Sequence, residues 1–461
     1  MIKISKADQD SILQRIRDGR VDAASLSTSS LVDDIILSMH KHGVIGCLKR
    51  GFPDKRADNT TVPFDLMLAL AIAAKMKVHT SLTDIPFALT DHRTICELGY
   101  SMWDSDKDIG SGLMNEGTIR HLVRKYTSDE LIRSYNSTLQ EHIMDTLSIK
   151  SNIHILDCTK LEVNMKNNHY ENATVGRDSD GDVAKGYKLS TIRGIVGDRG
   201  IIEDIRFGTM STHDLALSQS MLYETPVFTD GDILINDKGF LSRDTLNFLK
   251  THRGVDTYIP IRKNMEAYEI AVAVAQKANK WKPHPTQRRT SQSISFVAGL
   301  SPYWRSKHTE DDVDINACVV WDREDDKYFV FVTTDTTKSA SQIIKTYELR
   351  PEIEEDYRQL KDFWNIEDFK STKLTNISFR IVCVLLGYLF FQLYTMLPDG
   401  EQFAGKSLPV IMKNYKSNAS HHLVIYSDEI FGVLTIAQMA EVYAQCDKTV
   451  RRLISAILEN V

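Results

Sequence analysis

Residues 152–163 read NIHILDCTKLEV, and this stretch decides the class of the fold. Its β-branched and apolar residues predict a buried β-strand. Two further strand-like runs follow, GYKLSTIRGIV at 186–196 and IIEDIRFG at 201–208, and the glycine-containing GDRG between them predicts a hairpin turn. We therefore expect the chain to form a sheet from about residue 151 onward.

Helices and strands alternate after this hairpin. The segments STHDLALSQSMLY (211–223) and SRDTLNFLKTHRG (242–254) predict helices, the second ended by its glycine. DILIN (232–236) and VDTYIPIR (255–262) predict short strands. A hairpin followed by such alternation favours a mixed α/β sheet over a wholly parallel one.

The alternation breaks after residue 262. Up to about residue 335 the chain has polar, turn-rich segments, and INACVVWD (315–322) and KYFVFVTT (327–334) predict a second hairpin. Residues 243–307 carry 12 Lys and Arg against 4 Asp and Glu, although the whole chain has a formal net charge of −6. We interpret this part as a basic, β-rich insertion in the α/β core.

Helical patterns flank the core on both sides. PFDLMLALAIAAKM (63–76) and SDELIRSYNSTLQEHIM (128–144) predict N-terminal helices, the second capped by Ser128. IVCVLLGYLFF (381–391) is too short to span a bilayer and predicts a buried helix. We therefore expect a helical N-terminal domain, the first part of the core, the insertion, the last part of the core and a helical C-terminal region, at residues 1–148, 149–262, 263–335, 336–375 and 376–461.

The bulk composition is that of a folded protein, with 42% hydrophobic and 26% charged residues in 461. The six cysteines include no CxxC pair, which excludes a zinc ribbon and provides no disulfide framework. The N-terminal segment MIKISKADQDSILQRIRDGR lacks the apolar core of a signal peptide. We expect a cytoplasmic protein without membrane contact.

Two aspartates occur where buried strands are predicted. Asp157 lies in the first strand, and Asp237 directly follows the strand at 232–236. Carboxylates at the ends of adjacent strands face the crevice where open α/β sheets bind ligands. A buried carboxylate also needs a cation or hydrogen-bond donors as partners. Each aspartate taken alone is explained equally well as a strand-end cap.

A third acid occurs in the charged run YELRPEIEEDYRQLKDFW at 347–364. Pro351 suits the first turn of a helix, and one face of that helix then combines an acid with cations. The residues concerned are Glu354, Tyr357, Arg358 and Lys361, with Arg350 just before the helix. A carboxylate flanked by cations suits a metal ion beside a phosphate chain. A solvated amphipathic helix is the simpler alternative.

This run resembles the Tyr-Arg-Glu-Lys signature of the insertion-sequence-four family of transposases, which are bacterial DDE enzymes of the Tn-five type. The matching positions are Tyr347, Arg350, Glu354 and Lys361. The segments LDCTK and NDKGF, which contain Asp157 and Asp237, are similar to the two aspartate motifs of the family. The resemblance covers about residues 152–369 and includes a β-rich insertion.

The resemblance implies an RNase H-like core in which Asp157, Asp237 and Glu354 are the catalytic residues and bind two Mg²⁺ ions, for which Mn²⁺ can substitute. It implies a DNA transposase that cleaves DNA at element ends and transfers the strand to target DNA by a two-metal mechanism. The implied partners are double-stranded DNA, as terminal inverted repeats and as target, and a second copy of the chain. The implied location is the bacterial cytoplasm, on the nucleoid when bound to DNA.

Seven side chains are expected to contact DNA: Tyr347, Arg350, Lys361, Arg288, Arg289, Arg120 and Arg124. The first three would hold phosphates of the DNA end. The next two lie in KWKPHPTQRR (280–289) and would contact phosphates without reading bases. The last two lie on the polar face of EGTIRHLVRKY (116–126), which fits a DNA-contacting helix or an ordinary wet surface.

Other interpretations fit the same residues. A related metal-dependent nuclease would cleave DNA without joining strands, and a domesticated descendant would bind DNA without catalysis, which the intact acids disfavour. The apolar stripe of the C-terminal helix (448–461) suits either a dimer interface or packing onto its own domain. RDSDGD (177–182) has its glycine at the wrong step for a calcium loop, and histidines such as His154 show no paired ligand spacing.

Overall fold

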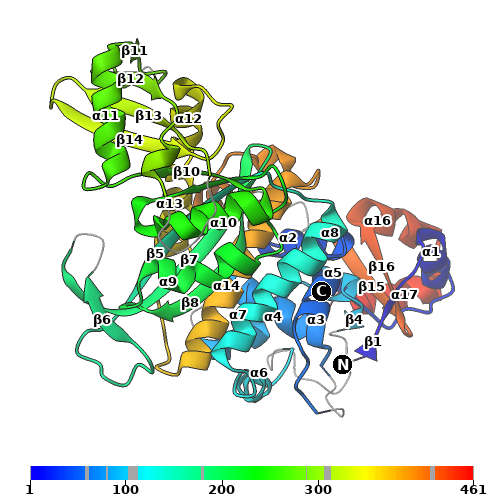
Figure 1. Cartoon of the computed structure of the whole chain (residues 1–461). Coiled ribbons are helices and arrows are strands. Elements are labelled where there is room, and N and C mark those ends of the chain that lie inside the picture. The colour runs from blue at the N-terminus through cyan, green and yellow to red at the C-terminus, as the bar shows by residue number, and fades with distance from the viewer. Residues whose placement is uncertain are drawn as a thin grey trace. The chain divides into compact units, whose positions relative to one another are not determined.

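The computed structural model describes residues 2–57, 62–78, 81–101, 113–177, 181–286, 288–305, 313–415 and 421–459. Residues 178–180 of the acidic RDSDGD segment lie outside these ranges. The chain divides into two compact units (Figure 1). Unit 2 is the central segment Leu139–Asp362, and unit 1 combines Met1–Thr138 with Phe363–Val461.

The core of unit 2 is a mixed sheet. Its central strands are β5 (Ile153–Val163), β7 (Val183–Val196), β8 (Arg199–Thr209), β9 (Ile233–Asn236) and β10 (Asp256–Pro260). β7 pairs antiparallel with β5 and with β8, whereas β9 pairs parallel with β5 and with β10. The order is therefore β8-β7-β5-β9-β10, which confirms the prediction of a mixed α/β sheet. The short strand β6 (Thr174–Arg177) pairs with the start of β7.

Two helices cover one face of this sheet, α9 (Asp214–Glu224) and α10 (Arg243–Arg253). Their buried side chains pack with Leu156 of β5 and Leu234 of β9 in one apolar cluster. α10 ends at Gly254, which has a left-handed φ of 66° and stands so close to Asp230 that a Cβ would lie 1.8 Å from its Oδ1. The predicted end of this helix is confirmed.

The inserted strands do not form a separate sheet. β14 (Lys327–Thr333) pairs antiparallel with β10, and the sheet continues through β13 (Asn316–Asp322), β12 (Gln292–Val297) and β11 (Lys282–Pro283). The β13–β14 hairpin is the one predicted. The sequence analysis missed helix α11 (Glu266–Ala278), because its valines favour strands locally; its alanine face, buried against these strands, decides the helix.

Helices α12 (Ala340–Tyr347) and α13 (Pro351–Asp362) close unit 2. α13 begins at the proline, as predicted, and buries Ile353, Tyr357 and Leu360. The Tyr357 hydroxyl donates a hydrogen bond to the main-chain oxygen of Asp157 at 2.7 Å and lies 2.7 Å from Thr191 Oγ1. The tyrosine therefore fastens α13 to β5 and β7.

Unit 1 is mainly helical. It contains α2 (Leu31–Lys41), α3 (Val44–Gly51), α4 (Phe64–Met76), α6 (Glu116–Val123), α7 (Ser128–Ser137) and α14 (Leu374–Met396). Within the described part of the chain, α14 alone is long and apolar enough to cross a membrane, and 83% of its apolar window is buried inside the protein against α2, α4 and α7. The predicted buried helix is therefore the centre of this unit.

Two details of unit 1 differ from expectation. Thr127, not Ser128, caps α7, because Thr127 and Glu130 form a reciprocal capping box. The C-terminal region is not wholly helical, since β15 (His422–Ser427) and β16 (Ile430–Thr435) form a hairpin. Asp428 in its turn has a φ of 51°, a conformation that aspartate tolerates.

This hairpin belongs to a four-stranded sheet with strands from the other end of the chain, β2 (Ser5–Lys6) and β3 (Ala23–Leu26). Helices α1 (Gln9–Arg17), α16 (Ile436–Gln445) and α17 (Lys448–Leu458) pack on it. The apolar stripe of α17, with Ile454 fully buried, therefore packs onto its own unit.

Short elements complete the described chain. They are β1 (Ile2–Lys3), η1 (Leu82–Phe87), α5 (His92–Glu97), β4 (Tyr100–Ser101), η3 (Thr138–Ile143), α8 (Met144–Leu147), η4 (Lys238–Phe240), η5 (Ser301–Tyr303), η6 (Glu401–Phe403) and α15 (Leu408–Asn414).

Candidate active site

The two aspartates lie side by side within the sheet, where β9 ends and β5 continues to Val163. β5 and β9 run parallel, and their register pairs Leu156 with Asn236. Asp157 and Asp237, each one residue further along, therefore lie side by side. Both point away from the α9 and α10 face, which Leu156 occupies, because successive side chains alternate along a strand. Only Asp237 therefore stands at a strand end, and Asp157 lies inside β5, so the prediction that both acids stand at the ends of adjacent strands is wrong for Asp157.

Glu354 reaches the same place from α13. The guanidinium of Arg350 donates one hydrogen bond from Nη1 to Glu354 Oε1 at 2.5 Å and another from Nη2 to Asp157 Oδ2 at 2.9 Å. One cation thus joins the first and third acids of the predicted triad. The structure thus joins Asp157 and Glu354 through Arg350, and the charges of all three acids act on its guanidinium.

The electrostatics of the site reflect this crowding. Burial raises the pKa of Asp157, the charge of Arg350 lowers it, and the charges of Asp237 and Glu354 raise it further, to about 6 in total. Burial likewise raises the pKa of Tyr347. The charge of Arg350 lowers this pKa, and the charges of the three acids raise it. Three carboxylates against one guanidinium leave an excess of negative charge that a further cation would relieve.

The donor set is chemically suited to a hard divalent cation, because all three acids offer carboxylate oxygens. Within the described ranges, however, no three His, Cys, Asp or Glu side chains stand in a ready-made metal-binding arrangement. Asp157 and Glu354 instead accept hydrogen bonds from Arg350. The residues present fit a metal by charge and ligand type.

Two cavities adjoin the acids, and Tyr347 and Phe329 line both. The first, of about 650 Å³, is also lined by Arg288, Arg289 and Arg350. The second, of about 700 Å³, has Asp237 in its wall, with the cations Lys238, Arg262 and Lys263. The two arginines of the insertion therefore line the same cavity as Tyr347 and Arg350 of the helix signature.

Not every predicted residue of the helix faces the acids. Arg358 is half exposed and makes ion pairs with Glu355 at 2.6 Å and Asp362 at 3.5 Å on the outer side of α13. Arg358 therefore lies at the exposed margin of the face that it shares with Glu354, whereas Tyr357 on the same face is buried. Lys361 is partly buried, one turn beyond Tyr357.

Arg120 and Arg124 are placed elsewhere. Both belong to unit 1, where the apolar face of α6, Ile119, Leu122 and Val123, is buried as predicted. The two arginines line a separate basic cavity in that unit.

Some residues that shape the site escaped the sequence analysis. Arg193 of β7 holds α13 in place, since its Nε donates to Asp356 Oδ2 at 2.7 Å and its Nη1 lies 2.7 Å from Glu352. The residues are more than 150 positions apart, so no local pattern reveals the contact. Lys238, by contrast, lies within the quoted NDKGF motif and offered a signal that was not used.

Residues 176–390, a little under half of the 461, match the family model described as Transposase DDE domain. The match supports a DDE transposase. It includes Asp237 and Glu354 and begins after Asp157. No curated protein matches the chain. The matched family consists of enzymes of the nuclease and transposase kind that act on DNA and generally use divalent metal ions, so the match implies an enzyme of this kind.

Proposed function

We propose that this protein is a DNA transposase of the insertion-sequence-four family that cleaves DNA at the ends of its element and joins the freed ends to target DNA. The observation that carries the proposal is the meeting of Asp157, Asp237 and Glu354, from two parallel strands and one helix, around Arg350. The strand order β8-β7-β5-β9-β10 supports an RNase H-like core.

In this proposal Asp157, Asp237 and Glu354 hold two Mg²⁺ ions, or Mn²⁺ in their place. When bound, such ions lower the pKa of a water or 3′-hydroxyl nucleophile and stabilise the leaving oxygen. Without metal, Arg350 balances the negative charge of the carboxylates. With metal present, its guanidinium would be released from them and could donate hydrogen bonds to a DNA phosphate. Tyr357 keeps the main chain of Asp157 fixed through its 2.7 Å hydrogen bond.

The DNA end lies, in this proposal, across Tyr347 and Phe329. Arg288 and Arg289 flank this ridge on one side, and the cations of the second cavity flank it on the other. The phosphates on both sides of the scissile bond would therefore lie beside cations, and Asp237 would lie next to the DNA strand. Lys361 is proposed to hold the same strand farther along α13.

Further parts of the proposal concern the whole protein. Unit 1, with Arg120 and Arg124, binds the terminal inverted repeats, and a second copy of the chain completes the complex with target DNA. The protein works in the bacterial cytoplasm, on the nucleoid. The family match favours this DNA-acting role.

The deciding experiment uses a duplex that carries the element end, with a labelled 3′ strand and a plasmid target, in Mg²⁺ and in Mn²⁺. Wild type should nick the duplex at the end and join it to the plasmid, and Asp237→Asn should do neither while it still binds the duplex. Nicking without joining would favour the nuclease alternative. Binding without nicking in either metal would favour the non-catalytic descendant.

A further inference from the structure

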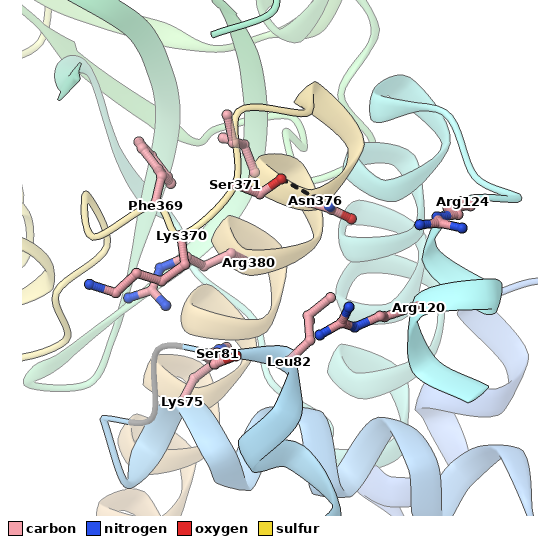
Figure 2. A pocket seen from close by; sticks show the side chains of 11 residues that line it. Lys75, Ser81, Leu82, Arg120, Arg124, Phe369, Lys370, Ser371, Asn376 and Arg380 are labelled. Carbon is pink, nitrogen blue, oxygen red and sulfur yellow. Dashed lines mark hydrogen bonds between the residues drawn. The ribbon is translucent and has the colours of Figure 1, made fainter. Parts of the chain in front are cut away.

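Unit 1 contains a cavity of about 250 Å³ whose wall is strongly basic. Its cations come from separate elements, which Figure 2 shows: Lys75 from α4, Arg120 and Arg124 from the end of α6, and Lys370 and Arg380 from α14 and the residues before it. Among the described residues that line the cavity, none is acidic.

The neighbouring acids lie outside the wall and have partners. Asp368 makes an ion pair with Lys370 at 2.8 Å, and Glu116 lies 3.6 Å from Arg120. Asp84 belongs to the reciprocal cap of η1, where it accepts a hydrogen bond from the main chain of Ser81. The described wall of the cavity therefore consists of cations and uncharged side chains.

Two of the cations are buried. Lys75 is 2% exposed and Arg380 is 6% exposed, whereas Arg120 and Arg124 are exposed at the rim. Bringing like charges together out of water costs folding free energy, and packing alone would be served better by apolar residues. Arg380 also donates a hydrogen bond to the main-chain oxygen of Asn365 at 2.6 Å, and an anion between floor and rim would add its charge to the contacts that these side chains already make.

The remaining lining groups are suited to an oxyanion. Ser81, Ser371 and Asn376 place hydroxyl and amide groups among the cations, and Asn376 donates to Ser371 Oγ at 3.0 Å. Asn376 lies in the first turn of the 23-residue helix α14, whose N-terminal end favours negative charge. The volume corresponds to roughly eight water molecules, which suits a small group.

We propose that this cavity binds a phosphate group, supplied either by a DNA backbone or by a free phosphorylated molecule. Arginine forks and a lysine ammonium around a tetrahedral dianion form charge-assisted hydrogen bonds, the strongest that such a wall can make. The site does not depend on the carboxylate chemistry of unit 2, but its DNA-backbone source rests on the repeat binding proposed above for Arg120 and Arg124.

The test measures binding of inorganic phosphate and pyrophosphate to the full chain, without divalent metal, by calorimetry and thermal denaturation, at an ionic strength held constant with chloride. The Arg288→Ala/Arg289→Ala background removes the two arginines that line the first cavity of unit 2. In that background phosphate should raise Tm above the chloride control. Lys75→Met should weaken phosphate binding roughly tenfold or more, because a hydrogen bond to a charged group is lost.

Arg120→Ala/Arg124→Ala provides a second variant, which changes only exposed side chains and should fold even where Lys75→Met does not. It should weaken phosphate binding as well. Arg133→Ala is the matched control, since Arg133 is exposed on α7 and does not line the cavity. Phosphate that acts no better than chloride, or that binds both cavity variants like wild type, would overturn the proposal.

A short DNA duplex of arbitrary sequence separates the two sources. If a DNA backbone is the source, the duplex should displace phosphate, and the rim variant should lower the slope of log affinity against log salt by roughly two. If a free phosphorylated molecule is the source, pyrophosphate should bind while the duplex leaves it in place. Asp237→Asn should bind phosphate normally, so failure here and failure of the proposed cleavage are distinguishable.

Discussion

The guanidinium of Arg350 donates a 2.9 Å hydrogen bond to Asp157, a residue 193 positions earlier in the chain. This contact places the helix signature against the first aspartate strand. It also gives the site a compensating charge while three carboxylates face one another. The consequences for metal dependence and for the division of roles along α13 can be measured.

Arg350→Ala should lower Tm in the absence of divalent metal, because Asp157 and Glu354 lose the cation between them. Adding Mg²⁺ should then raise Tm more than it does in wild type, since the ion replaces the missing charge. Thermal denaturation with and without Mg²⁺ measures both effects. Equal Mg²⁺-induced shifts in the two proteins would contradict the idea that arginine and metal serve the same carboxylates.

Glu354→Gln should abolish cleavage of element-end DNA and leave affinity for that DNA largely intact, because a neutral amide is a poor ligand for Mg²⁺. Glu355→Gln is the matched control on the next residue, whose carboxylate pairs with Arg358 on the outer side of the helix. The control should change stability by under about 0.5 kcal/mol and cleavage not at all. Cleavage and gel-shift series at matched salt provide the comparison.

Lys361→Ala should show the opposite pattern to Glu354→Gln. Loss of a phosphate contact should weaken binding of the DNA end, and some cleavage should return when DNA is raised to saturation. If the lysine and glutamate variants behaved alike in binding and in cleavage, these two residues of α13 would not have separate roles.

The buried His154 predicts a loss of stability at alkaline pH. Its Nδ1 lies 2.9 Å from Glu203 and its Nε2 lies 3.2 Å from Asp232. Burial alone would lower the pKa of His154, but hydrogen bonds to these acids and their charges raise it from 6.5 to about 9. The folded state thus holds a proton that the unfolded chain releases above pH 6.5.

The stabilisation from His154 is fully present below pH 6.5 and is lost as pH rises through about 9. The loss should be on the order of 3 kcal/mol in the free energy of unfolding. Denaturant titrations across this range should show the fall in wild type and in His169→Gln, a change at an exposed histidine. If the free energy of unfolding of His154→Gln fell by the same amount over this pH range, the loss of stability would belong to other groups.

The contribution of Lys75 to stability depends on pH in the opposite direction. Burial and the charge of Arg380 lower its pKa from 10.5 to about 8, against smaller opposing effects of Cys383, Asp84 and Asp368. The unfolded chain therefore binds more protons between these values, so stability without phosphate should rise with pH from about 8. Phosphate binding should weaken over the same range as the ammonium is lost. Calorimetry at a series of pH values checks this, and Lys75→Met should remove the dependence.

The sequence by itself determined the elements of the sheet and the composition of the site. Periodicity and turn residues predicted the β7–β8 and β13–β14 hairpins, the end of α10 at Gly254 and the start of α13 at Pro351, because these depend on neighbours within a few residues. The spacing around Glu354 and the two aspartate motifs likewise selected the three acids.

Only the tertiary structure decided which of these residues meet. The register of β5 and β9 places Asp157 beside Asp237, Arg350 pairs with Asp157, and N- and C-terminal strands share one sheet. The basic cavity of unit 1 is likewise lined by residues from distant segments of the chain, among them Lys75, Arg120 and Arg380. Such contacts follow from which apolar faces bury one another across the whole chain, and no local pattern of the sequence records that choice.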